Sequence, residues 1–395
     1  MKSAIKGTAL VHLDFILTGV VMALLGPMLP TLSTRWSLND TQAGYLFTAQ
    51  FAASVGGMLL SGVLVRRHGY RLTLVEGLIL MAMGIATLAQ ANWVLGLVSV
   101  CVFGTGFGLT VPAGNLLIAK INPVNRAAQL NLLNSSWGVG AMSCPLLVAG
   151  AQRSSHIHSF LYATATTLAA LAVGLCLVSF AHDARPANPD HHPTLTASIS
   201  SEFFVAIVAG LFFIYVGTET CMGGWIALYA RRLDSGSHAF WAVTPSFFWG
   251  AMLLGRFFAP VMLRRLRETR LATVGAALAT CGILVLLAAK TMTLVTAGAT
   301  LAGLGLASLY PINVSLLSHW LGETAARVSG MVFAAGSVGG GILPWLVGGL
   351  STRFGSLRVG FIVPWLGAVT LLAFYLVNER LSSRAVAQTS LTTPF

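Results

Sequence analysis

The sequence has few charged residues, and acidic residues are the scarcest among them. Of 395 residues only 9% are charged, with 11 Asp and Glu against 23 Lys and Arg, whereas 56% are hydrophobic. Soluble globular proteins carry charge on about a quarter of their residues. With a mean hydropathy of +0.80, the composition excludes a soluble domain of this length. It predicts an integral membrane protein.

Motifs of several other protein classes are missing. The phosphate-binding pattern G-x-x-x-x-G-K is absent, and the five Cys fall within apolar runs without disulfide or metal-ligand spacing. His191 and His192 lie in a polar segment, but no third or fourth ligand follows at zinc spacing. The basic residues occupy short gaps between apolar runs. We therefore predict no enzymatic activity, no metal or cofactor, and no nucleic-acid partner.

Apolar stretches long enough to cross about 30 Å of hydrocarbon predict the transmembrane topology. Twelve are present, over residues 9–33, 41–65, 73–91, 93–119, 128–151, 157–181, 201–231, 238–263, 270–289, 291–317, 324–351 and 357–378. The loops on the side of the two termini, with the termini, hold fifteen Lys and Arg, and the opposite loops hold seven. Because basic loops stay in the cytoplasm, we expect both termini there, in a multi-pass protein of the plasma membrane (the inner membrane of a bacterium).

A tandem repeat relates the two halves of the chain. A shift of 199 positions brings Gly104 and Pro112 onto Gly303 and Pro311, and other positions keep the same offset. Six spans in each half make the two repeats parallel. We predict an all-α integral membrane fold of twelve transmembrane helices in two parallel six-helix repeats. The expected parts are an N-terminal bundle over 1–181, a polar cytoplasmic linker over 182–200, and a C-terminal bundle with a short tail over 201–395.

A basic motif follows the second span and supports a family resemblance. Residues 62–71 read G-V-L-V-R-R-H-G-Y-R, and a weaker counterpart follows span 8. With twelve spans in parallel halves, the chain resembles the major facilitator superfamily over nearly its whole length. Arg67, Gly69 and Arg71 match the family motif, so the resemblance implies a role in conformational gating. Arg66 stands where the family usually has an Asp that pairs across the bundle, so the usual cytoplasmic latch lacks its acid.

Within that superfamily the chain resembles the fucose permease group of sugar:proton symporters. The segments that carry the likeness are N-L-L-N-S-S-W-G from Asn131, Y-V-G-T-E-T-C from Tyr215, L-G-R-F from Leu254, Y-P-I from Tyr310 and G-G-G-I-L-P from Gly339. The resemblance implies a secondary transporter of sugar. Gly26 and Val111 replace the two acids that couple protons in that group, so its coupling residues do not carry over.

Two acidic residues lie well inside predicted spans, and they are the candidates for proton coupling. An ionisable group at membrane depth is costly unless it is paired or neutral, so it indicates function by default. Glu219 is the first candidate, with a structural ion pair as the alternative. Asp14 is the second, and could equally be an acid tied to a neighbouring Arg or hydroxyl. Arg256, the one Arg well inside a span, needs a carboxylate or carbonyl partners; the resemblance implies cytoplasm-side packing in gating, and substrate contact is the alternative.

The resemblance also implies where a solute binds. Spans 1, 4, 7 and 10 line the cavity in this superfamily, and span 5 adds polar residues. Amides bind sugar hydroxyls, and Trp rings cover the apolar faces of a sugar. The expected substrate-binding residues are Asn115, Asn131, Asn134, Trp137, Glu219, Trp225, Tyr310 and Asn313. For Asn131, a hydrogen bond between helices is an equal alternative.

These observations predict a proton-coupled secondary transporter of a small polar solute, with a sugar as the expected one, that works by alternating access. Its expected partners are the solute, protons and the lipid bilayer, and we expect a monomer. A drug or metabolite:proton antiporter is the first alternative, because Gly140, Pro145 and Gly150 form part of the motif of that group, with Cys144 in place of its second Gly. A receptor or scaffold that has lost transport is the second alternative.

Overall fold

The computed structural model describes residues 2–122, 125–178, 199–233, 240–322 and 324–392, and within these residues all regular structure is helical. The first half contains α1 (Lys2–Ala23), α2 (Leu25–Arg35), α3 (Asp40–Gln90), α4 (Trp93–Ile121), α5 (Arg126–Arg153) and α6 (Ile157–Leu177). The second contains α7 (Ile199–Leu233), α8 (Phe240–Leu263), α9 (Glu268–Ala288), α10 (Met292–Leu306), α11 (Leu309–Leu321), α12 (Thr324–Phe354), α13 (Leu357–Gly360) and α14 (Ile362–Thr392).

Helix α3 is two membrane spans joined at one glycine. Its 51 residues would extend about 75 Å if straight, more than twice the hydrocarbon thickness. Gly69 interrupts it with φ 88°, a backbone conformation that residues with a Cβ rarely adopt. Eleven stretches of the described chain are long and apolar enough to span a membrane, with α3 counted once and the pairs α1–α2 and α10–α11 each forming one span. The predicted twelve-span architecture is therefore confirmed.

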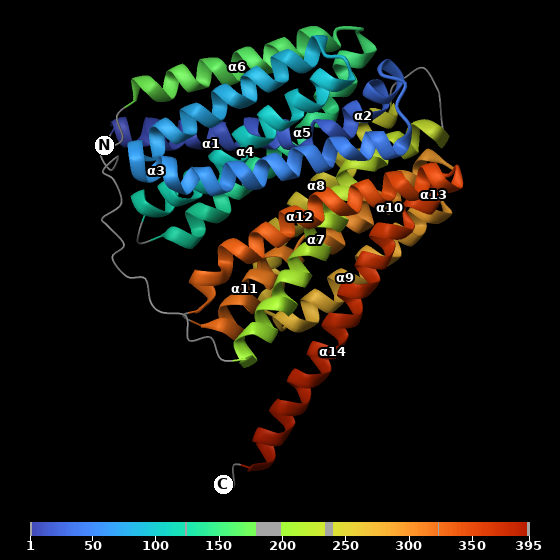
Figure 1. Ribbon diagram of the computed structural model, residues 1–395. Helices are drawn as coiled ribbons and strands as arrows, with labels where there is room; N and C mark the ends of the chain where they lie inside the picture. The colour runs from blue at the N-terminus through green and yellow to red at the C-terminus, as the bar shows by residue number, and fades with distance from the viewer. Residues whose placement is uncertain (1, 123–124, 179–198, 234–239, 323, 393–395) are drawn as a thin grey trace.

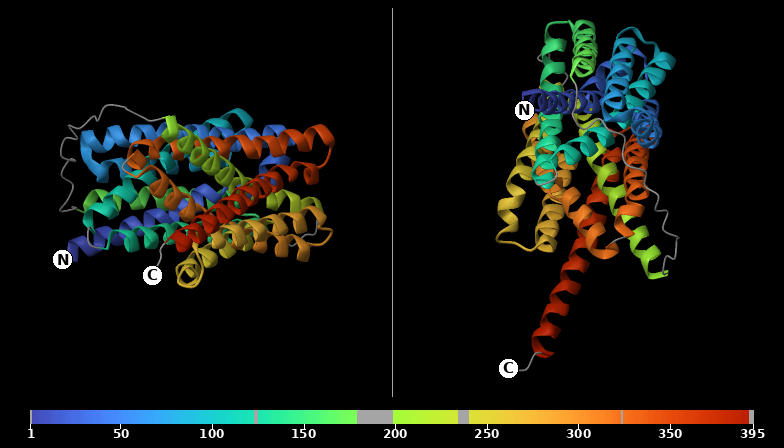
Figure 2. Two further views of the ribbon diagram at one scale, coloured as in Figure 1. Left: turned by 90° about the horizontal axis from the view of Figure 1, so that it is seen from below. Right: turned by 90° about the vertical axis from the view of Figure 1, so that its left-hand side faces the viewer.

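The helices gather into two groups that follow the chain order. Figure 1 shows α1–α6, in blue to green, beside α7–α14, in yellow-green to red, and Figure 2 shows the same separation from two further directions. In the first group α3 packs on α4 and α6, and α1 packs on α5. In the second, α12 packs on α7, and α10 packs on α8 and α9. The predicted linker, 182–200, lies almost wholly outside the described residues, so the domain boundaries stay a prediction.

Proline breaks one span in each half. Pro27 and Pro311 have no N–H, so the carbonyls of Ala23 and Ala307 lose their helical partners four residues later. The helix is interrupted at these places, between α1 and α2 and between α10 and α11. Both breaks lie inside a membrane span.

Glycine allows the helices to approach closely. A Cβ on Gly140 would lie 1.9 Å from the carbonyl oxygen of Ile16, and one on Gly19 would lie 2.1 Å from that of Trp137. These two contacts bring α1 and α5 backbone to backbone, as small residues do in membrane helix pairs. Gly140, which the sequence also fits to an antiporter motif, has a packing role here.

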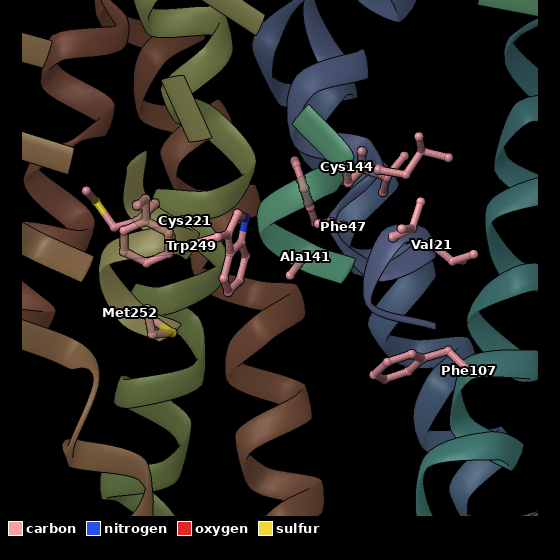
Figure 3. Packing of buried hydrophobic residues seen from close by; sticks show 14 of the residues in the cluster. Val21, Phe47, Phe107, Ala141, Cys144, Cys221, Trp249 and Met252 are labelled. Carbon is pink, nitrogen blue, oxygen red and sulfur yellow. The ribbon is translucent and has the colours of Figure 1, made fainter. Parts of the chain in front are cut away.

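The two groups of helices contact each other toward one end of the molecule, which we call the closed end. The last turns of α7 and α12 meet the first turn of α3 there, and the start of α2 crosses α7 nearby. A Cβ on Gly26 of α2 would lie 2.2 Å from the carbonyl oxygen of Gly223 on α7. Phe47 packs on Trp225, with ring centroids 6.0 Å apart. Figure 3 shows Trp249 of the second half reaching toward the helix that carries Ala141 in the first.

A bidentate ion pair lies at the closed end. The two terminal nitrogens of Arg232 on α7 donate to the two carboxylate oxygens of Asp40 on α3, at 2.8 and 2.5 Å. The hydroxyl of Ser351 on α12 also donates to Asp40, and the Thr41 amide donates to the Thr352 hydroxyl at 2.9 Å. Asp40 is buried. Paired charges of this geometry are among the stronger hydrogen bonds in proteins, so this pair joins the two groups of helices.

We predict that Gly26→Ala opens the closed end. The added methyl group has no room beside Gly223, so α2 and α7 must separate. Spin labels at Ser37 and Arg353, measured by double electron–electron resonance, should report longer distances than in the parent protein. Gly210→Ala on α7 is the control, because a Cβ there meets no atom within 4 Å. Equal distances in all three proteins would contradict the close crossing.

Loss of the ion pair should loosen the same end. Arg232→Gln leaves the buried Asp40 carboxylate without its cation, and we expect a cost of about 1 to 2 kcal/mol, since the Arg232 side chain is itself half exposed. Peptides covering residues 40–47 should then exchange amide hydrogens faster in mass spectrometry. Arg231→Gln is the matched control, because Arg231 stacks on Trp241 instead, 5.2 Å from the ring. An equal effect of both substitutions would show that the ion pair does not hold the two groups of helices together.

Candidate solute-binding site

Polar side chains of α4 and α5 form an uncharged cluster in the first half, which we call the amide cluster. The Asn134 amide nitrogen lies 3.3 Å from the Asn115 side-chain oxygen and also donates to the Leu130 carbonyl at 2.8 Å. Nearby, the His12 ring on α1 and the Ser136 hydroxyl on α5 are 2.9 Å apart. Asn115 and Asn134 are not fully buried. Amides of this kind can donate to and accept from the hydroxyls of a polar solute.

The second half contributes an ionic cluster from α7, α8 and α11. Glu219 and Arg256 approach to 3.9 Å between carboxylate oxygen and terminal nitrogen. Tyr215 hydrogen-bonds to Glu219, and its hydroxyl accepts from Arg256 at 3.3 Å. The Tyr310 ring, which is partly exposed, lies 5.8 Å from the Tyr215 ring between centroids. The ion pair that was the alternative interpretation of Glu219 is thus present. Its partner Arg256 has the carboxylate that a guanidinium inside a membrane span requires.

Asp14 is a buried acid without a cation near it among the described ion pairs. Its side chain is fully buried, and one carboxyl oxygen accepts from the Thr18 hydroxyl at 3.2 Å. The other oxygen has no hydrogen-bond partner within the described part of the chain. A buried charged carboxylate costs far more than a buried carboxylic acid unless it is paired. Asp14 and Glu219 therefore have opposite surroundings.

Several predicted site residues do not join these clusters. Trp225 is fully buried at the closed end, where its indole nitrogen donates to the Pro344 carbonyl at 3.1 Å, so it has no access to a solute in this conformation. Asn313 is also fully buried, and its oxygen accepts from the Tyr375 hydroxyl of α14 at 2.6 Å. Trp137 packs edge-on against Trp249, with ring centroids 5.7 Å apart. Asn131 is exposed on α5.

The predicted gating residues near Gly69 lie at the opposite end from the ion pair of Asp40. Gly69 makes the turn inside α3. Arg71 donates to the Val178 carbonyl at the end of α6, at 3.1 Å. Arg67 is exposed. These contacts stay within the first half, so the gating role remains a prediction.

Sequence reasoning missed three of the participating residues. Tyr215 appeared in it only as part of a motif, although its spacing of four residues from Glu219 places both on one helix face. Asp40 and Arg232 lie just outside the predicted spans 41–65 and 201–231, so they do not appear among the candidate residues. The sequence did contain a signal for this ion pair. An acid at the start of one span and a base at the end of another can meet when both lie on the same side of the membrane.

The model of the Major Facilitator Superfamily matches residues 14–297. The chain belongs to this superfamily. It is therefore a multi-pass membrane transporter rather than an enzyme. It is similar to the glucose/mannose transporter GlcP of Bacillus subtilis, with 24% identity over 95% of this chain and 94% of the relative. It is also similar to a glucose/galactose transporter of Brucella abortus, with 26% identity over 91% of each chain.

Solved structures show the same fold. The bacterial homologue of the lysosomal transporter Spinster, in its inward-facing and unoccupied conformation, gives a TM-score of 0.78 with 14% identity, over 96% of this chain and 97% of the other. The transporter FucP in its outward conformation gives a TM-score of 0.63 with 21% identity, over 95% and 99%. The expected resemblance to the fucose permease group is thus confirmed at the level of the fold.

We predict that the partly accessible Asn134 and the buried Asn313 behave differently on substitution. Asn134→Ala should raise the half-saturation concentration for the transported solute about twofold to tenfold, the effect of one lost hydrogen bond. Asn313→Ala should instead lower the unfolding temperature, because it removes the partner of Tyr375. Counterflow kinetics and thermal unfolding of the purified variants separate the two effects. If Asn313→Ala raised half-saturation as much as Asn134→Ala, Asn313 would belong to the solute site.

Proposed function

We propose that the protein carries a sugar of the hexose class across the plasma membrane by alternating access, coupled to protons. The observation that carries this proposal is that each half has its own polar cluster, an uncharged amide cluster in the first and an ionic cluster in the second. Both clusters lie inside apolar helices, where polar residues are costly and usually functional. The printed names of the two relatives, which are transporters of glucose with mannose or galactose, support a hexose.

The distribution of basic residues supports an orientation. With fifteen Lys and Arg on the side of the termini and seven on the other, both termini are placed in the cytoplasm. The closed end, which carries Asp40 and Arg232, then faces the outside of the cell. In this orientation the structure corresponds to an inward-facing state, with the outer side sealed. In a bacterial cell the membrane concerned is the inner membrane.

Asp14 is the better candidate for the proton. Glu219 has a cation 3.9 Å away and can stay ionised through the transport cycle. Asp14 has one hydroxyl partner and a free carboxyl oxygen among the described residues, so a bound proton is the cheapest way to neutralise it in this closed environment. When its surroundings open to water on one side, the proton can leave there. Alternation between these two environments gives coupling.

Substitution of the two acids in proteoliposomes tests the assignment. We expect Asp14→Asn to keep counterflow, which needs no gradient, and to lose accumulation driven by a pH gradient, so that the inside and outside concentrations become equal. Glu219→Gln should still respond to the pH gradient. The side chains are of matched size, and each variant loses only one titratable carboxyl.

The remaining outcomes contradict the assignment in distinct ways. Loss of accumulation in Glu219→Gln alone would place the proton on Glu219, as the sequence first indicated. Normal accumulation in both variants, or accumulation of solute by the parent protein with a sodium gradient instead of a pH gradient, would overturn proton coupling at Asp14. Absence of counterflow for every hexose tested would overturn the sugar.

A further inference from the structure

The ionic cluster has capacity for a ligand. Glu219 on α7 and Arg256 on α8 are separated by 3.9 Å, which is at the limit of an ion pair, and their side chains are 13% and 26% exposed. The buried Nε–H of Arg256 has no hydrogen-bond partner among the described residues. Its terminal nitrogen meets only the phenol of Tyr215 at 3.3 Å in addition to Glu219. Arginine has five N–H donors and a carboxylate has about four acceptor sites, so several remain available.

The exposed part of this pair must face water rather than lipid. Charged groups within membrane spans face the interior of the bundle or an aqueous cavity, because the hydrocarbon gives them no partner. On α8 the neighbours Phe257 and Phe258 are largely exposed, which suits a lipid-facing surface, whereas Arg256 is directed to Tyr215 and Glu219 on α7. A solute in the transport pathway can therefore reach both charges.

We infer that Glu219 and Arg256 form a charge filter that restricts the transported solute to uncharged polyols. The two charges cancel, so the site has hydrogen-bonding capacity without net charge. Neighbouring hydroxyls of a sugar can donate to the carboxylate and accept from the guanidinium at the same time. A sugar acid or a protonated amino sugar brings a net charge that the neutral pair does not balance, so it would lose its hydration without compensation. This inference rests on the proposed transport of sugar and specifies its class.

The filter predicts opposite changes of specificity for the two partners. Glu219→Gln keeps the size of the side chain and leaves Arg256 without its anion, so the site should favour a sugar carboxylate. Arg256→Gln leaves Glu219 without its cation, so the site should favour a protonated amine. The double variant Glu219→Gln/Arg256→Gln restores neutrality, and should again prefer the uncharged sugar even if its affinity is lower. The double variant therefore separates an effect of charge from an effect of lost contacts.

Competition against glucose counterflow in proteoliposomes at pH 7 tests the inference, with glucose, glucuronate and glucosamine as competitors. The parent protein should prefer glucose over both charged sugars by at least about tenfold, a difference of 1.4 kcal/mol. In Glu219→Gln the ratio of glucuronate to glucose inhibition should rise about tenfold, and in Arg256→Gln the glucosamine ratio should rise similarly. Variants without counterflow are compared by the ligand-induced rise in the unfolding temperature of purified protein.

The outcomes that overturn the filter differ from those that overturn the sugar. A parent protein that transports glucuronate or glucosamine as well as glucose contradicts the filter without any variant. A parent selective for glucose whose single variants lose affinity for all three sugars in the same order makes the pair structural. A parent that neither transports nor binds any of the three contradicts the proposed sugar transport itself.

Discussion

The hydrocarbon interior supplies no hydrogen bonds, and this constraint determines the arrangement of the protein. Every backbone N–H and C=O within the membrane must find a partner in the chain, which the helix provides. Charged side chains within the membrane also need partners in the chain. The carboxylate of Glu219 has Arg256 and Tyr215 as partners. In Asp14 only one of the two carboxyl oxygens has a partner, the hydroxyl of Thr18. The roles proposed for the two acids rest on this difference in pairing.

The contact between the two halves depends on glycine as well as on charge. Gly26 allows α2 to cross α7 at Gly223 with the backbones nearly touching. In the fucose permeases, which this chain resembles, the position of Gly26 carries a proton-coupling Asp. A side chain there would not fit this crossing. The tight crossing at Gly26 therefore leaves no room for an acid at this position, and this is why the proposed coupling is sought at another acid.

The sequence was sufficient for the architecture because span length, hydropathy and the 199-residue offset are properties of single segments or regular patterns. The boundary between α1 and α2 was not visible in the same way, since it depends on a proline inside an unbroken apolar run. Site residues were harder to predict. Glu219 and Arg256 were each singled out, but their pairing depends on the rotation of α7 against α8, which no pattern within one helix specifies.

Trp225 and Asn313 show most clearly why the sequence alone does not identify the residues that bind the solute. Both lie on spans that line the pathway in this superfamily, and both residue types suit a sugar. The structure uses Trp225 to bond Pro344 at the closed end and Asn313 to bond Tyr375. A polar or aromatic residue in a membrane helix can serve another helix as readily as a ligand. The choice between these uses depends on which way the side chain faces in the folded bundle.

The one-residue turn at Gly69 has a consequence for biosynthesis. Spans joined by long loops can enter the bilayer one at a time, with the loop waiting on either side. The two spans of α3 have no such loop, because a single glycine with φ 88° reverses the chain between them. We therefore expect them to enter together as a helical hairpin. In the proposed orientation, the basic residues Arg66, Arg67 and Arg71 beside the turn keep its tip in the cytoplasm.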